Sequence, residues 1–325
     1  GTSTTLKQLT SGYFTDVTLL AANTEFFLFA LEVTNDSSNI VYARFAADGT
    51  VEVPITSLTS AAGNNTGLVV APANDGFGIL WGARLDNKSD LDFATMRFDG
   101  TFENPPGLVV SSSDWTEPAA LVATNRGFLA SYAQSGMTGG GNYVLAIAPD
   151  GAVGAATALS TTDWYSVNGR HSLLWRGTEA LLAWSRMEGT SDDERLGSTI
   201  MLTRLGADAQ RLADDLRVSA WVRSQDNRDP KLFARGNDVG LTWSQGSVIY
   251  ICAGCMPDNH LEFVIFDGTS FAPKSALRKM TNPATAGGLI SPTIAQQGND
   301  IITASVVGYH TSSELAAGTF TCTGR

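Results

Sequence analysis

The sequence predicts an all-β protein, and more specifically a six-bladed β-propeller, from three observations. The chain of 325 residues contains 33 glycines and only 16% charged residues, whereas a charged fraction of about 25% is usual for soluble domains. A D-G turn recurs along the chain at nearly constant spacing. A short apolar run that tends to end in an aromatic residue recurs in step with that turn. Two markers repeating with one period indicate a repeat architecture.

The D-G turns follow apolar runs and precede others, as the turn of a β-hairpin does. They are Asp48-Gly49, Asp99-Gly100, Asp150-Gly151 and Asp267-Gly268, with Leu205-Gly206-Ala207-Asp208 as a degenerate copy. The first three aspartates are 51 residues apart, and the steps to Asp208 and then Asp267 are 58 and 59 residues. Each turn therefore predicts a hairpin between the third and fourth strands of one repeat.

The second marker is a polar turn followed by a β-prone run, and each copy is preceded by another β-prone stretch. Its six copies span residues 23–30, 74–81, 125–132, 177–184, 236–243 and 298–305. Together the markers give a four-strand unit of about 50 to 60 residues, which is typical of a propeller blade. We expect one domain over residues 1–325, with blades at 12–60, 61–112, 113–163, 164–220, 221–280 and 281–325.

The last predicted blade lacks a fourth strand, and residues 1–11 contain an orphan strand at Thr4–Leu9. We expect this N-terminal strand to close the ring. A seventh, partial blade is an alternative because the strand-like segment Ser247–Cys252 falls outside the repeat. A stacked sandwich or solenoid of similar hairpins is the other alternative.

Composition narrows the partners and the location. The net charge of −11 argues against a nucleic-acid partner, because such binding needs clustered lysine and arginine. No stretch approaches the roughly 20 apolar residues of a transmembrane helix. The first residue is Gly1 and the chain is poor in lysine but rich in serine, threonine, asparagine and glycine, so we expect a bacterial protein that is secreted, periplasmic or on the cell surface. Three cysteines, Cys252, Cys255 and Cys322, allow one disulfide in such a compartment.

The connections between predicted blades carry the residues expected to bind a ligand, because loops on a rigid scaffold commonly carry function. Aromatic faces beside polar side chains suit sugars and small polar ligands. The candidates are Trp115, Trp164, Tyr165, Trp221, Arg223 and Asp229. The alternative is that each tryptophan fills a gap between neighbouring blades. A second aromatic set, Trp81, Tyr132, Trp184 and Trp243, is assigned to packing between blades.

All three histidines are expected on the same loop face. His171 precedes a predicted first strand, and His260 and His310 are placed in loops between second and third strands. Three converging imidazoles could hold zinc or copper, but no closely spaced pair is present. No cofactor is therefore predicted, and a metal ion held by these histidines is an alternative to scattered surface residues.

Carboxylates at the start of first strands form another candidate set, namely Asp16, Glu117 and Asp229. The segment Asn227-Arg228-Asp229-Pro230-Lys231 resembles the R-D-P-K motif of the five-bladed propeller glycosidases of the invertase and levansucrase type. The resemblance implies that Asp229 steadies an oxocarbenium-like transition state. Asp16, in Phe14-Thr15-Asp16-Val17, takes a position loosely similar to the nucleophile of that family, whose N-D-P-N and E-C motifs are missing here. The alternative is that an acidic residue followed by proline simply begins a strand.

These observations favour an exported, non-catalytic recognition protein that binds a glycan or other small polar ligand on the loop face of the propeller, with a glycan or cell-surface ligand as its partner. One alternative is a secreted glycoside hydrolase or lyase that uses the carboxylates at the strand starts. Another is a copper- or zinc-binding protein that uses the histidines. The fold itself does not choose among these functions.

Overall fold

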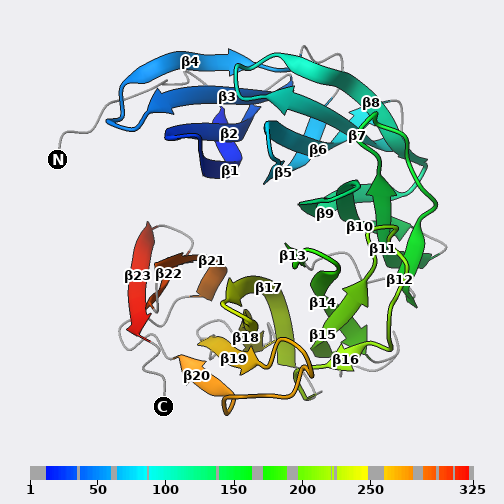
Figure 1. Cartoon of the computed structure of the whole chain (residues 1–325), viewed down its shortest axis with the longest axis vertical. Helices are drawn as coiled ribbons and strands as arrows, with labels where there is room; N and C mark the ends of the chain where they lie inside the picture. Colours follow the sequence, from blue (N-terminus) through cyan, green and yellow to red (C-terminus); the bar gives the residue numbers. More distant parts are fainter. Residues whose placement is uncertain are drawn as a thin grey trace. The chain divides into compact units, whose positions relative to one another are not determined.

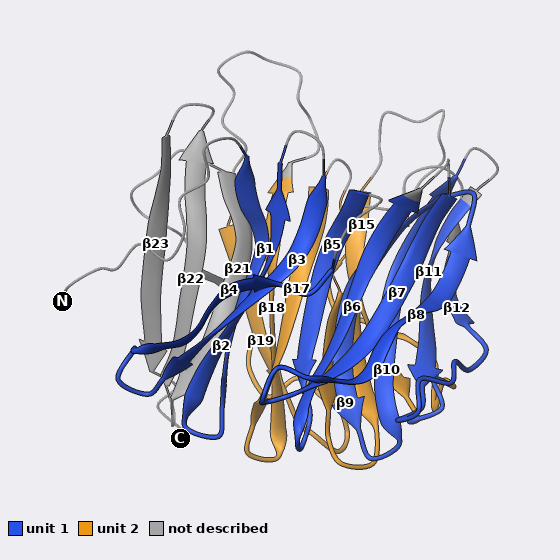
Figure 2. Cartoon of the chain, turned by 90° about the horizontal axis from the view of Figure 1, so that it is seen from above, with its two compact units in different colours: residues 1–161, 207–209 blue, residues 162–206, 210–325 orange. Residues whose placement is uncertain are grey.

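The computed structural model confirms the all-β class. It describes residues 12–34, 37–59, 64–85, 88–136, 139–162, 171–188, 197–220, 222, 225–247, 260–280, 288–297, 300–309 and 312–321, and these contain strands and turns but no helix (Figure 1). The chain divides into two compact units, one of residues 1–161 with 207–209 and one of residues 162–206 with 210–325 (Figure 2).

Among its described residues, unit 1 contains three antiparallel sets of four strands, each in chain order. The first two sets are joined by one parallel pair, Ser38 with Asn64. The strands are β1 (Tyr13–Ala22), β2 (Glu25–Val33), β3 (Ser38–Ala46) and β4 (Val51–Ser57); β5 (Asn64–Pro72), β6 (Gly76–Leu85), β7 (Lys88–Arg97) and β8 (Phe102–Ser112); and β9 (Trp115–Thr124), β10 (Gly127–Gly136), β11 (Gly139–Ile147) and β12 (Thr157–Thr162).

Unit 2 repeats this construction in its described residues, with two four-stranded sheets and one three-stranded sheet. The strands are β13 (Ser172–Trp175), β14 (Ala180–Glu188), β15 (Gly197–Leu205) and β16 (Leu216–Arg217); β17 (Gln225–Arg235), β18 (Asp238–Ser247), β19 (His260–Phe266) and β20 (Arg278–Met280); and β21 (Gly288–Gln297), β22 (Asp300–Tyr309) and β23 (Ser312–Thr321). The N-terminal strand expected at Thr4–Leu9 lies outside the described residues, so the number of blades and the closure stay predictions.

The D-G turns join third to fourth strands as predicted. At Asp48 the carboxylate Oδ1 accepts a hydrogen bond of 2.9 Å from the Thr50 amide, and Gly49 takes φ +86°, which glycine adopts without strain. The same bond recurs in the turns of β7–β8, β11–β12 and β19–β20, at Asp99, Asp150 and Asp267. Local chemistry therefore sets the turns of the repeat.

The sheets bury apolar faces against one another. Trp81 lies in a cluster between the first two sheets with Phe29 and Ile40, and Tyr132 lies in a cluster between the second and third sheets. In unit 2, Trp243 packs with Ile200 and other residues of the β13–β16 sheet. These aromatic residues of the second strands fill the spaces between sheets, as their position in the repeat predicted.

A polar clasp repeats between neighbouring sheets at the end where first strands begin. The Ser38 hydroxyl donates to the Asn65 carbonyl oxygen (2.7 Å), and the Ser89 hydroxyl lies 3.1 Å from the Thr116 carbonyl oxygen. Both pairs are 27 residues apart in sequence. Because the partners belong to different sets of four strands, each clasp fixes the beginning of a first strand relative to the set before it.

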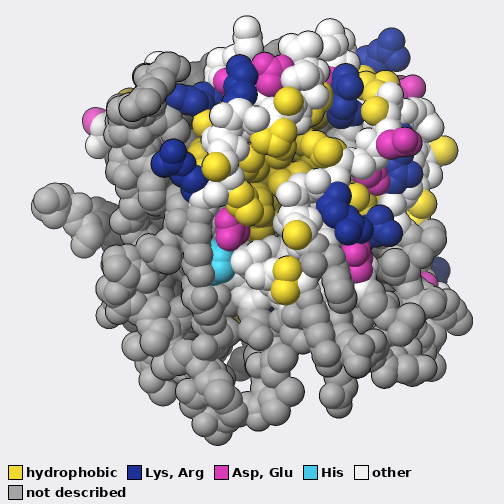
Figure 3. All heavy atoms as spheres, turned by 90° about the horizontal axis from the view of Figure 1, so that it is seen from below, with side chains coloured by type: hydrophobic (Ala, Val, Ile, Leu, Met, Phe, Trp, Pro, Cys, Tyr) yellow, Lys and Arg dark blue, Asp and Glu magenta, His cyan; other side chains and the backbone are white. Residues whose placement is uncertain are grey.

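The large apolar side chains exposed in unit 2 include Leu212, Leu216 and Leu277. Figure 3 shows hydrophobic side chains gathered on one face of the molecule, beside lysine and arginine. These leucines lie on or next to β16 and β20, the fourth strands of their sheets. They are therefore at the sheet edge opposite the first strands.

Candidate functional site

Asp16 and Asp229, both predicted from the sequence, lie in β-bulges on the first strands of their sheets. In β1 the register with β2 shifts between Thr15 and Thr18, and in β17 the register with β18 shifts between Arg228 and Lys231. Asp16 has φ +49° and Asp229 has φ +53°, in the left-handed region. A bulge redirects the side chain of its extra residue and is common next to active sites. Both aspartates are half-buried, so their carboxylates combine a fixed backbone with partial access to solvent.

The corresponding bulge of β5 contains glycine instead. The register of β5 shifts between Thr66 and Leu68, and Gly67 has φ +56°. A Cβ atom at Gly67 would lie 3.0 Å from Pro118 Cδ. Glycine therefore serves the close approach of β9 at this position and contributes no functional group.

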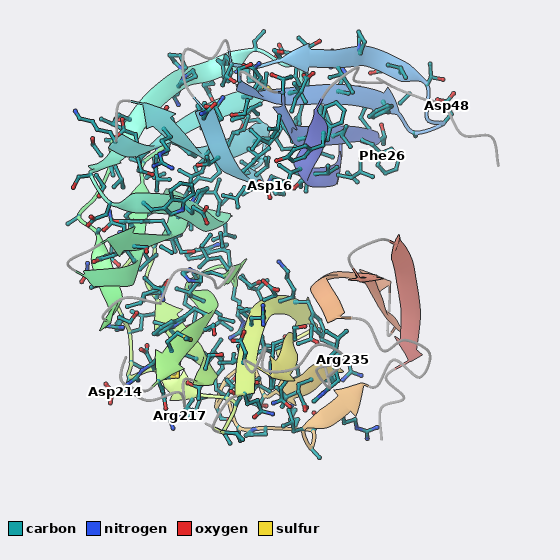
Figure 4. The ribbon with its side chains drawn as sticks, turned by 180° about the vertical axis from the view of Figure 1, so that it is seen from behind. Asp16, Phe26, Asp48, Asp214, Arg217 and Arg235 are labelled. Carbon is teal, nitrogen blue, oxygen red and sulfur yellow. The ribbon has the colours of Figure 1, made fainter. Side chains whose placement is uncertain are left out.

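In unit 1 the first strands lie next to one another, with β5 in contact with both β1 and β9 (Figure 1). Figure 4 shows Asp16 on β1, away from Asp48 at the tip of the β3–β4 turn. Glu117 lies on β9, opposite Ala133 of β10 and directly before Pro118. In unit 1, Asp16 thus lies on β1 and Glu117 on β9, the two first strands that contact β5.

Trp115 is the first residue of β9 and is half-buried. The guanidinium carbon of Arg84, at the end of β6, lies 4.9 Å from the centroid of its ring. Trp115 and Glu117 are two residues apart on one strand, so their side chains leave the same face about 7 Å apart. An aromatic ring, a guanidinium and a carboxylate therefore gather at the start of β9.

In unit 2 the strand leading into the Asp229 bulge is held by Asn227, which is fully buried. The Asn227 Oδ1 atom accepts hydrogen bonds of 3.0 Å from both Trp243 Nε1 and Gln245 Nε2. Its side-chain Nδ2 donates to the Ser198 carbonyl oxygen. Its backbone N–H donates to the Ser198 hydroxyl at 2.6 Å. This is the clasp of unit 1 with more contacts, and it fixes the backbone two residues before Asp229.

The basic residue next to Asp229 is engaged by another carboxylate. The adjacent Arg228 pairs with Asp226 at 2.6 Å, and within the described part of the chain no basic side chain lies within 4.0 Å of Asp229. On β13, the first strand of the preceding sheet, the Ser172 hydroxyl accepts a 2.9 Å hydrogen bond from the backbone N–H of Leu232 in β17. His171, just before Ser172, is therefore beside the strand that carries Asp229.

His171 is 2% exposed. Burial lowers the pKa of its imidazole from 6.5 to about 3, because a charged ring is poorly solvated there. At neutral pH this histidine is uncharged.

The prediction that His260 lies in a surface loop is wrong. His260 begins β19, pairs in register with Gln245 of β18 and is 5% exposed. Its Nε2 atom lies 2.8 Å from Oε1 of Glu262, which is also buried. The ladder between β18 and β19 therefore includes the histidine, and the carboxylate of Glu262 is a hydrogen-bond partner of its ring. No cluster of three or more histidine, cysteine, aspartate or glutamate residues able to hold a metal ion occurs in the described segments.

Several predicted residues lie outside the described residues. These are Trp164, Tyr165, Trp221, Arg223, His310 and the three cysteines Cys252, Cys255 and Cys322. The sequence reasoning also missed Arg84 and Asn227. A signal for the clasp was present, since serine recurs 27 residues before the residue it contacts in two repeats and 29 before Asn227.

No protein-family model and no curated protein matches the sequence significantly. Solved structures do share the fold. An α-L-arabinofuranosidase from Fusarium graminearum, in complex with an iminosugar inhibitor, has a TM-score of 0.56 at 9% identity over 93% of this chain and 91% of that chain. The parainfluenza virus 5 hemagglutinin-neuraminidase has a TM-score of 0.55 at 8% identity over 94% and 88%.

A sialidase from Trypanosoma rangeli, in complex with the inhibitor DANA, has a TM-score of 0.54 at 9% identity. The similarity covers 95% of this chain and 55% of that chain, so this protein spans about half the length of the sialidase. At such identities the similarity establishes the fold alone. The chain has the all-β architecture of the glycoside hydrolase and sialidase propellers. In the described residues no helix is long and apolar enough to cross a membrane.

Proposed function

We propose that the protein is a glycan-processing propeller, a glycoside hydrolase that uses carboxylates on its first strands. The observation that carries the proposal is the placement of Asp16 and Asp229 in left-handed bulges of β1 and β17. A non-glycine residue in this conformation costs about 1 to 2 kcal/mol, and such strain clusters at active sites. Proteins of the same fold include the arabinofuranosidase and the sialidase named above, both with bound inhibitors.

The chemistry requires two carboxyl groups with different tasks. One protonates the leaving-group oxygen, and the other acts as nucleophile or activates water. Asp16, Glu117 and Asp229 are the candidates for these two groups. The carboxylate of Asp229 is not engaged by its neighbour Arg228, because Arg228 is already paired with Asp226. A carboxylate that is not engaged by a cation is available to a developing positive charge on a sugar ring.

The test is a hydrolysis screen with aryl glycosides and natural oligosaccharides. Asp16→Asn, Asp229→Asn and Glu117→Gln keep the side-chain shape but remove the acid and the negative charge. We expect Asp16→Asn or Asp229→Asn, or both, to lower kcat by about a hundredfold or more while the protein stays folded, and Glu117→Gln tests the third candidate. The control variants Asp75→Asn and Asp214→Asn change exposed aspartates and should keep full activity. Full activity in both Asp16→Asn and Asp229→Asn contradicts the proposal.

Trp115 favours a second candidate function, non-catalytic recognition of a glycan or cell-surface ligand. Its half-buried ring next to Arg84 supplies an aromatic surface and hydrogen-bond donors without requiring an acid. Saturable glycan binding by the unaltered protein, with no product released and no effect of Asp229→Asn, would support this function over hydrolysis. For either function we propose an exported protein, which fractionation of the source cells can test.

A further inference from the structure

We propose that Arg84 and Trp115 form a subsite for a sugar that carries a single carboxylate. This inference rests on the proposed action on glycans and names the class of glycan. Arg84 is exposed near the end of β6, and Trp115 is half-buried at the start of β9. Their 4.9 Å separation is that of a cation–π contact, which holds the guanidinium in one orientation without using its N–H groups.

Among the described arginines, Arg84 differs from those that pair with a carboxylate. Arg44 pairs with Glu52 and Arg204 with Glu179, whereas among the described residues no carboxylate oxygen lies within 4.0 Å of Arg84. A guanidinium carries five donors in a planar fork that matches a carboxylate. With one face on Trp115, the edge of Arg84 keeps those donors for a ligand.

The charges around Arg84 limit the ligand to one negative group. Asp90 lies on β7, where it accepts a 2.7 Å hydrogen bond from the Ser111 hydroxyl. Asp114 directly precedes Trp115, and Glu117 follows it on the same strand. The net charge of −11 gives no general attraction for anions. A polysulfated or polycarboxylated chain would be repelled, while a single carboxylate beside Arg84 would be neutralised locally.

The subsite also has a defined relation to the proposed chemistry. The side chains of Trp115 and Glu117 leave the same face of β9 about 7 Å apart, roughly the width of one sugar ring. A sugar carboxylate at the edge of Arg84 would therefore place the ring beside the Arg84–Trp115 pair and a neighbouring glycosidic bond toward Glu117. The subsite would select substrates with a terminal or adjacent acidic sugar.

The experiment measures binding of matched oligosaccharides that differ only in one group, such as a galacturonate oligosaccharide with a free or methyl-esterified end residue. We expect the unaltered protein to bind the free acid at least about tenfold more tightly, as charge-assisted hydrogen bonds allow. Arg84→Gln should abolish the preference, and Arg84→Lys should keep only part of it because it lacks the fork. Arg126→Gln is the control, since Arg126 is exposed in the β9–β10 turn of the same unit.

Equal affinity for the two oligosaccharides, or a preference that survives Arg84→Gln, overturns the subsite. Failure of the subsite and of the hydrolase proposal can be told apart. Acid preference that depends on Arg84 without any hydrolysis supports the subsite and contradicts the enzyme. Hydrolysis that depends on Asp229 but not on Arg84 supports the enzyme and contradicts the subsite. If neither galacturonate oligosaccharide binds, the subsite is wrong, and the hydrolysis screen alone decides the hydrolase proposal.

Discussion

Replacing Asn227 by alanine tests the idea that a buried polar clasp holds the strand before Asp229. Asn227 is 0% exposed, and so is Trp243, whose indole N–H donates to its side chain. The substitution removes the acceptor of Trp243 Nε1 and the donor to the Ser198 carbonyl oxygen. Gln245 is half-buried and can turn its amide to solvent.

The magnitude follows from the groups left behind. A buried donor or acceptor without a partner costs about 1 to 3 kcal/mol, and the small cavity adds about 1 kcal/mol. The backbone N–H of residue 227 keeps its hydrogen bond to the Ser198 hydroxyl in the variant, so the backbone part of the clasp survives. We expect Asn227→Ala to lower the free energy of unfolding by about 3 kcal/mol.

The assay is denaturant unfolding followed by tryptophan fluorescence, with two comparisons. Asn104→Ala removes side-chain hydrogen bonds to the Pro149 carbonyl oxygen and to Thr95 Oγ1, neither of them fully buried, and should cost less than Asn227→Ala. Trp243→Phe removes the indole donor, so it should cost about 1 kcal/mol less in the Asn227→Ala background than in the unaltered protein. A loss below about 1 kcal/mol for Asn227→Ala, or strict additivity in this cycle, would refute the reasoning.

Three further predictions concern single residues. Because the folded pKa of His171 is about 3 and its ordinary value is 6.5, the unfolded state binds the proton first, and stability should fall as pH drops from about 6.5 toward 3; His171→Gln should flatten this part of a thermal-unfolding profile, and an unchanged profile would contradict it. Burial, aided by Tyr143, raises the pKa of Tyr132 from 10.0 to about 12, so stability should fall as pH rises between these values, and a Tyr132→Phe variant that loses as much stability at alkaline pH would count against this. Gly67→Ala adds a Cβ 3.0 Å from Pro118 Cδ at φ +56° and should cost more than Gly151→Ala, whose Cβ meets open space at φ +84°; equal losses of unfolding free energy would argue against close approach of β9.

The turns of this fold were predictable because their chemistry is local. Asp48 bonds the amide two residues later and Gly49 takes the left-handed backbone, so two adjacent residues determine the turn. The aromatic Trp81 and Trp243 were equally readable, since each ends an apolar run of the second strand. Residues near one another in sequence therefore carried most of the prediction of the strands.

The site was predictable only in part because much of it depends on register between strands. Asp16 and Asp229 were chosen from their place at strand starts, but their bulges arise from the pairing with β2 and β18. Arg84 and Trp115 lie on different sheets, so nothing local links them. His260 was predicted in a loop because a polar residue at the end of a strand pattern is typical of a loop. Its burial depends on the hydrogen bond with Glu262, which the sequence pattern did not predict.

The bulges of β1, β5 and β17 also bear on the choice between an enzyme and a repeated binding protein. If the bulge were needed only to start a strand, glycine would be the least strained choice in every repeat. Gly67 is found where Pro118 approaches closely, whereas Asp16 and Asp229 keep a carboxylate at the cost of a strained backbone. A protein that binds through many equal sites would repeat one side chain in every sheet. The first strands instead carry Asp16 in the bulge of β1 and Gly67 in the bulge of β5, whereas Glu117 of β9 pairs regularly with Ala133. The first strands therefore differ in chemistry from sheet to sheet, as an enzyme with one asymmetric site requires.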